Sequence, residues 1–197
     1  MDISDIERLN VLWLRIYPYL AAQVIGILPE KAGIILEVGP FSGGIGFELA
    51  REKRDSSVVI ADSHEEILGY LKAETARLKL PGRVDLVRSD PSRLGFKSGV
   101  FSGVVFRGAF FFLDSSMLRE IDRVLEPGGV GFIGGGFGAG TPPDLIREIS
   151  LESRILNERL GKRRISRGEL EDMAASSGLQ GHCRITERGG LWLILQK

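Results

Sequence analysis

The chain has 197 residues, which is enough for one domain with a full hydrophobic core and too short for two. Lysine plus arginine and aspartate plus glutamate number 26 each, so the formal net charge is zero, which disfavours nucleic acid as the main partner. A single cysteine and two histidines exclude an internal disulfide and a multi-cysteine zinc site, so we expect no metal.

The beginning of the chain lacks the pattern of a cleavable signal, because Asp2, Asp5 and Glu7 interrupt its apolar residues. No apolar run approaches the roughly 20 residues that span a bilayer. We therefore expect a cytoplasmic protein without a membrane partner.

Helical patterns open the chain. The first runs from Ser4 to about Ile16, and a second begins near Tyr17 and Pro18, since proline is tolerated in a first turn. Trp13 and Tyr17 would be i, i+4 partners if the first helix continued, which favours core packing for both.

From about residue 33 to 134, short apolar runs alternate with helical patterns. The runs are continuously apolar, as expected of strands that are covered on both faces. The repeated order of strand and helix predicts right-handed crossovers and a doubly wound α/β sheet. The predicted strands are Ile34–Val38, Val58–Ala61, Val84–Val87, Gly103–Phe106 and Val130–Ile133.

Capping residues predict where the helices begin and end. Ser63 to Glu66 has the pattern of a capping box, Asp114 or Ser115 can cap the next helix, and Pro127-Gly128-Gly129 should end it.

Behind this body, Thr141 to Asp144 opens a long amphipathic helix to about Leu160, and Ser166 to Glu169 opens another. The last segments, Leu179–Ile185 and Leu191–Leu195, flank a glycine pair and predict a β-hairpin.

The glycine-rich loop LEVGPFSGGIG, Leu36 to Gly46, joins the first strand to a helix. No Gly-Lys-Ser/Thr follows, which excludes a P-loop. A dinucleotide loop needs a second glycine where Phe41 stands, and Glu37 would face the pyrophosphate. Like charges in a poorly solvated cleft are costly, so an acid at this position favours a ligand that carries a cation.

S-adenosylmethionine (SAM) carries an ammonium and a sulfonium and has no phosphate. Glu37 could attract the ammonium directly or through water, while Gly39 and Gly43 would let the backbone approach the ligand. Asp62 could accept both ribose hydroxyls, and Asp90 the adenine amino group. The three acids end neighbouring strands, at the edge where open α/β sheets bind ligands, although each alone could be a helix cap or a solvated loop residue.

These motifs make the chain similar to the class I (Rossmann-like) SAM-dependent methyltransferases. The resemblance covers residues 30–135 and implies an α/β, doubly wound, mostly parallel seven-stranded sheet. Its order would be 3-2-1-4-5-7-6, with the last-inserted strand antiparallel and helices on both faces. The matching segments are LEVGPFSGGIG, VVIADSHEEIL, VDLVRSDPSRLGF, FSGVVFRGAFFFLD and EIDRVLEPGGVGFIGG.

The resemblance also implies a single domain over residues 1–197, divided into an N-terminal helical lid (1–29), a cofactor-binding core (30–135) and C-terminal helices with a hairpin (136–197). The residues it implies for SAM binding are Glu37, Gly39, Phe41, Gly43, Asp62, Ser63, Asp90, Pro91, Phe106 and Arg107.

Two positions depart from the family pattern. Phe41 replaces a usual glycine, and Ser102 replaces the usual aspartate after Phe101. Phe41 could fill part of the methionine pocket or point away and shield the site, and we expect shielding.

Methyl transfer from a sulfonium is an in-line displacement in which the enzyme supplies orientation, so we predict positioning residues and assign no catalytic base. The acceptor should approach over the ends of the fourth and fifth strands, where Arg107, Phe111 and Tyr17 are the substrate-side candidates. Arg107 could clamp a carboxylate of the substrate or of the cofactor, or it could form a surface ion pair. The glycines at 134–138 suggest close approach of a ligand, a moving flap or a plain loop.

The sequence thus predicts a SAM-dependent methyltransferase that acts on a small-molecule acceptor, with its oligomeric state left open. One alternative is a methyltransferase-like partner subunit with little or no activity, motivated by Phe41 and Ser102. Another is NAD-dependent reduction, against which Glu37 argues. The basic cluster 162–167 could meet a phosphate or be a solvated helix end.

Overall fold

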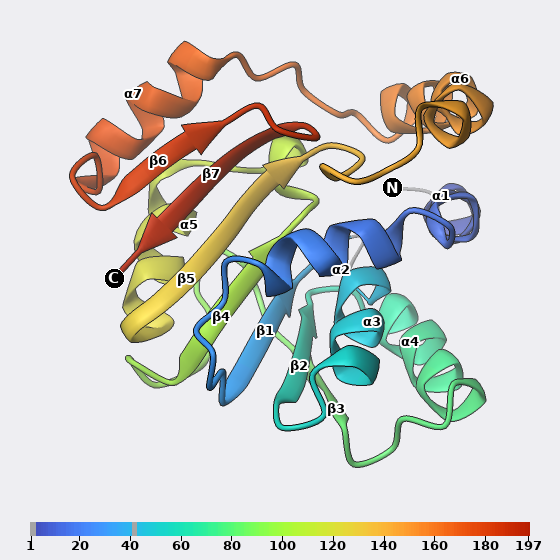
Figure 1. The fold of residues 1–197 in the computed structure, drawn as a ribbon, viewed down its shortest axis with the longest axis horizontal. Helices are drawn as coiled ribbons and strands as arrows, with labels where there is room; N and C mark the ends of the chain where they lie inside the picture. The colour runs from blue at the N-terminus through green and yellow to red at the C-terminus, as the bar shows by residue number, and fades with distance from the viewer. Residues whose placement is uncertain (1–2, 41–42) are drawn as a thin grey trace.

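A computed structural model describes residues 3–40 and 43–197, which form one seven-stranded sheet covered by helices on both faces (Figure 1). The strand order is β3-β2-β1-β4-β5-β7-β6, with β1 to β5 parallel and β7 antiparallel to both of its neighbours. The predicted fold class and order are confirmed. The strands are β1 (Ile34–Val38), β2 (Ser57–Asp62), β3 (Val84–Arg88), β4 (Phe101–Phe106), β5 (Leu125–Gly135), β6 (Cys183–Thr186) and β7 (Leu191–Gln196).

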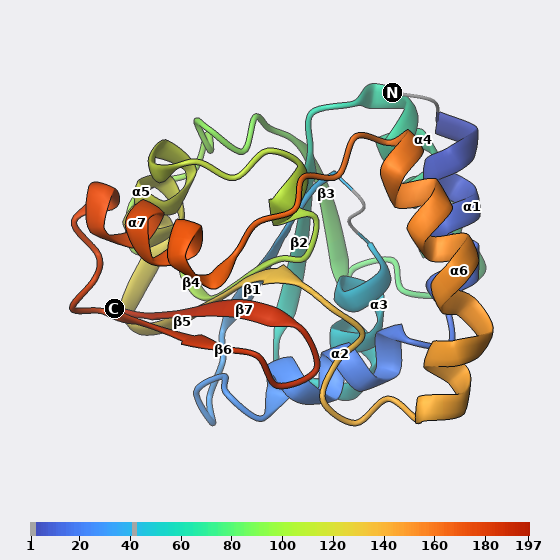
Figure 2. The same cartoon turned by 90° about the horizontal axis from the view of Figure 1, so that it is seen from above.

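The helices divide between the two faces of the sheet and build two hydrophobic cores. One core takes apolar side chains from α1, α2, α3, α4 and α6, and the other from α5 and α7. Figure 2 shows α5 and α7 on one side of β5 to β7 and α2 on the other. The helices are α1 (Ile3–Trp13), α2 (Tyr17–Ile25), α3 (Gly44–Glu52), α4 (Glu65–Arg77), η1 (Ala109–Phe111), α5 (Ser115–Val124), α6 (Pro143–Arg159) and α7 (Arg167–Ser177).

Two of the predicted helix caps are confirmed. The Asp114 side chain accepts hydrogen bonds from the backbone N–H groups of Ser116 and Met117 at the start of α5. Ser166 and Glu169 form a complete capping box at the start of α7. Each cap satisfies backbone donors that a helix start leaves unpaired.

The capping box predicted at Ser63 is wrong. The N-cap of α4 is His64, which makes no side-chain cap. The Asp62 carboxylate accepts the backbone N–H of His64 at 2.9 Å, and the Ser63 hydroxyl lies 3.2 Å from the His64 ring. Asp62 at the end of β2 therefore accepts the backbone hydrogen bond in this turn, and α4 starts one residue later than predicted.

The stop predicted at Pro127-Gly128-Gly129 is also wrong, because α5 ends at Val124 and those three residues lie in β5. Leu125 has extended geometry (φ −67°, ψ 137°) and pairs with Phe101 of β4. Burial of this leucine against the neighbouring strand ends the helix earlier than the proline would.

The glycine run after β5 packs against the turn of the β6–β7 hairpin. A Cβ on Gly136 would lie 2.3 Å from the Gly189 oxygen and from the Gly190 Cα. The N–H of Gly138, whose φ is +90°, donates to the same Gly189 oxygen at 2.8 Å. The sequence suggested that a ligand or a flap approaches these glycines closely. In the structure, the backbone of the turn between β6 and β7 makes this close approach.

Helix α1 is fastened to α6 from the far end of the chain. The Trp13 indole donates to the Ser153 hydroxyl at 2.9 Å, and Arg8 pairs with Glu152 at 2.6 Å. The two helices lie side by side in Figures 1 and 2. Trp13, the last residue of α1, lies against Arg107, which follows β4, and Phe137, which follows β5. Within residues 3–40 and 43–197, no helix is long and apolar enough to cross a bilayer.

Candidate functional site

Glu37 joins the end of β1 to the start of α3 through hydrogen bonds to Gly43 and Gly46. It lies at the end of β1 and is 1% exposed. Its Oε2 accepts hydrogen bonds from the N–H groups of Gly43 and Gly46, both at 2.8 Å. A Cβ on Gly46 would come within 2.5 Å of that oxygen, so only glycine admits the carboxylate. The negative charge faces the N-terminus of α3, where the helix dipole stabilises it.

The second oxygen of Glu37 has no hydrogen-bond partner among the described residues, although it is buried. Burial raises the pKa of this carboxyl to about 7, against the opposing effects of the Gly43 and Gly46 N–H groups and of the Arg107 charge. A buried, unpaired carboxylate oxygen fits a cationic ligand group, because a nearby positive charge would favour its ionised form.

This raised pKa predicts that stability falls as pH rises. The folded protein keeps a proton on Glu37 between about pH 4.5 and 7, where the unfolded chain has lost it. The free energy of unfolding should therefore fall across this window by about 3 kcal/mol and level off above pH 8. Urea denaturation of the wild type and Glu37→Gln from pH 5 to 8 checks this, since the variant should lack the fall. Equal slopes in both proteins would contradict it.

Asp62 is buried at the end of β2, next to the end of β1. Its Oδ1 accepts the His64 N–H and lies 3.0 Å from the His64 Nδ1. Asp90 lies two residues beyond β3 and is exposed, and the Ser92 hydroxyl and N–H hold its pKa below the usual range. Since β1, β2 and β3 pair in parallel, all three acids lie at the same edge of the sheet.

The other predicted cofactor residues have different surroundings. Ser63 is exposed and Pro91 is half-buried. The Phe106 side chain is fully buried in the core beneath α5 and α7, so only its backbone would be available to a ligand. Gly43 has a φ of +101°, and Leu71 fills the space where a Cβ would lie. Gly39 donates its N–H to the Ala61 oxygen.

Phe41 lies outside the described residues, so its predicted shielding of the cofactor stays a prediction. Ser102, the second departure, is buried in β4 and donates its hydroxyl hydrogen to the Ile34 oxygen at 3.0 Å.

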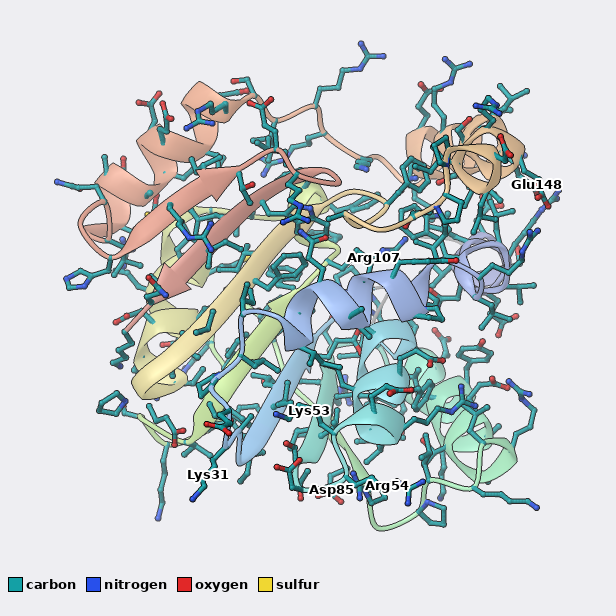
Figure 3. All side chains as sticks on the ribbon, viewed as in Figure 1. Lys31, Lys53, Arg54, Asp85, Arg107 and Glu148 are labelled. Atoms are coloured by element: carbon teal, nitrogen blue, oxygen red, sulfur yellow. The ribbon has the colours of Figure 1, made fainter. Side chains whose placement is uncertain are left out.

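Arg107 follows β4 and is 9% exposed, so the predicted alternative of a surface ion pair is wrong. Its guanidinium lies 3.9 Å from the centroid of Trp13, which in turn stacks on Phe137 with ring centroids 5.0 Å apart. Arg107 also donates to the Tyr17 hydroxyl at 3.4 Å, and Tyr17 donates to Asn10 at 2.7 Å. Figure 3 shows Arg107 beside α1. Arg107 and Tyr17, two of the three predicted substrate-side residues, are therefore in contact.

A cavity of about 430 Å³ lies next to this cluster, between α1, the end of β5 and α6. A separate small pocket of about 10 Å³, which shares Trp13, Phe110 and Lys162 with this cavity, is lined by Arg107 and by the half-buried Phe111, the third substrate-side candidate. Sequence reasoning missed Ser153 and Asn157 of α6, which line the cavity. No local signal marks either residue, because their place depends on how α6 packs against α1.

A model of a methyltransferase domain matches residues 35–129. Among solved structures, a candidate SAM-dependent methyltransferase of Methanococcus maripaludis is 26% identical, with a TM-score of 0.81 over 98% of this chain and 90% of that one. A SAM-dependent methyltransferase of Aquifex aeolicus has the same fold at 18% identity, with a TM-score of 0.69 over 100% and 97%. No curated protein matches the sequence significantly.

A third structure with this fold is the complex of the Haloferax volcanii Trm112 methyltransferase activator with a candidate methyltransferase, at 14% identity, with a TM-score of 0.64 over 96% of this chain and 93% of that one. The domain match, the strand order and the Methanococcus structure agree with one another. The chain is an enzyme with a methyltransferase domain and the class I, Rossmann-like fold of the SAM-dependent methyltransferases.

Proposed function

We propose that this enzyme transfers the methyl group of SAM to a small-molecule acceptor held in the cavity beside Arg107. The observation that carries the proposal is the gathering of Glu37, Asp62 and Asp90 at one sheet edge, with the unpaired oxygen of Glu37 buried there. These residues fit a ligand with a cationic amino acid end, a ribose and an adenine.

Each acid has a separate part in this proposal. Glu37 offers negative charge to the ammonium, Asp62 accepts the two ribose hydroxyls and Asp90 accepts the adenine amino group. Bound SAM supplies a methyl group already activated by its sulfonium. Trp13 and Tyr17 are both buried over the ends of the central strands, so they exclude water from the displacement.

Isothermal titration with SAM and with its demethylated product, S-adenosylhomocysteine, tests the proposal. We expect one-to-one binding of both compounds at micromolar concentrations and no binding of NADH. Folded protein that binds neither adenosyl compound would overturn the proposal, and binding of NADH would favour the dinucleotide alternative instead.

A second candidate is a methyltransferase that depends on a partner protein. The Haloferax structure, which is a complex with an activator, supports this candidate. Consumption of SAM by the isolated chain with acceptors from a cell extract would argue against it.

A further inference from the structure

The cavity beside Arg107 is lined by charged residues that are mostly of one sign. Its aromatic walls are Trp13, Phe110 and Phe137. Among the described residues that line it, the cations are Arg154, Lys162, Arg163 and Arg164, and the acid is Glu158. The protein as a whole is neutral, so this local excess of positive charge reflects its arrangement.

Arg107 adds a buried cation next to this space. It forms no salt bridge among the described residues, where its contacts are a 3.4 Å hydrogen bond to the Tyr17 hydroxyl and the face of Trp13, although its charge also acts on the buried Glu37. A buried guanidinium is normally paired, because leaving its charge unmatched away from water is costly. An anionic ligand in the cavity would supply the missing partner.

Lys162 is a second cation that an anion in this space would stabilise. It lines both this cavity and the separate small pocket beside Arg107. The residue as a whole is exposed, yet loss of water around its ammonium, together with the charge of Arg107, lowers its pKa to about 8. Two cations that repel each other across a cavity are both stabilised when an anion lies between them.

We propose that the methyl acceptor is a small aromatic acid whose anionic group lies between Arg107 and Lys162. Its ring would lie against the aromatic walls formed by Trp13, Phe110 and Phe137. The volume of about 430 Å³ suits such a compound and falls within the usual range for small-molecule sites. A carboxylate and a phosphate ester match the guanidinium equally well. This inference rests on the proposed methyl transfer and names its substrate class.

The test compares acidic aromatic ligands with a neutral one, and 4-hydroxybenzamide has the shape of 4-hydroxybenzoate without its charge. Binding of 4-hydroxybenzoate, phenyl phosphate and the neutral 4-hydroxybenzamide is measured by isothermal titration, with and without saturating S-adenosylhomocysteine. At least one acid should bind about tenfold more tightly than the amide. The more tightly bound acid identifies the anionic group. Equal affinity for acids and amide, or no binding of either acid, would overturn the proposal.

Lys162→Gln should weaken the preferred acid about tenfold and leave the affinity for S-adenosylhomocysteine unchanged. The matched control is Lys97→Gln, which removes an exposed lysine that lines neither space. Arg107→Gln should have the same effect on the acid, with thermal unfolding measured to confirm that it folds. Loss of cofactor affinity in Lys162→Gln with unchanged acid affinity would overturn the proposal. Titrations with SAM and S-adenosylhomocysteine alone test the proposed function separately. If neither compound binds, the proposed methyl transfer fails, whatever the result with the acids.

Discussion

Asp62→Asn is expected to weaken the binding of SAM about 100-fold without unfolding the protein. The carboxylate is proposed to accept two hydrogen bonds from the ribose, and an amide group offers one acceptor and no charge. Each charge-assisted bond contributes about 1.5–3 kcal/mol, so losing one and weakening the other gives an effect of this size. The fold should survive because the asparagine oxygen can still accept the His64 N–H that Asp62 accepts now.

Isothermal titration with S-adenosylhomocysteine measures the effect, and Asp85→Asn is the matched control. Asp85 is an exposed acid on the neighbouring strand β3, so its replacement removes the same charge without touching the proposed site. Equal affinities of the two variants would show that Asp62 does not hold the cofactor.

Glu37→Ala is expected to lower the free energy of unfolding by about 3 kcal/mol. The substitution leaves the Gly43 and Gly46 N–H groups without their shared acceptor, and each buried unpaired donor costs about 1–3 kcal/mol. Because these groups anchor the loop to β1, we also expect cofactor binding to be lost. Urea denaturation at pH 4.5 is the suitable measurement, since at the lower end of the window from pH 4.5 to 7 the ionisation of Glu37 affects the stability of the wild type least.

Glu37→Gln is the control for this prediction. It keeps an acceptor oxygen of the same reach and removes only the ionisable group, so it should retain most of the stability that alanine loses. If alanine and glutamine proved equally stable, the two hydrogen bonds would not be what holds the loop.

The strands and the edge at which the acids lie could be predicted because they depend on local patterns, whereas the strand order came from the resemblance to the family. Continuously apolar runs identify parallel strands, and parallel strands end at a common edge, so the sequence pattern places Glu37 and Asp62 at the same edge of the sheet. The boundaries near His64 and Leu125 were wrong because tertiary contacts override local capping signals there. A strand-end carboxylate decides the first boundary, and burial of Leu125 against Phe101 decides the second.

The surroundings of Arg107 could not be predicted for a related reason. The residues that contact Arg107 come from α1 and from the start of α2. No periodic pattern in the sequence shows which distant helix will cover the end of a strand. The sequence indicated an arginine suited to clamping a carboxylate. Only the structure shows that it is buried under Trp13 and lacks an acidic partner among the described residues.

The bond between Trp13 and Ser153 joins residues 140 positions apart. During synthesis, the cavity between α1 and α6 therefore cannot form until most of the chain has left the ribosome, since α6 supplies one wall. Contacts that close such long loops carry a large entropic cost and tend to form late.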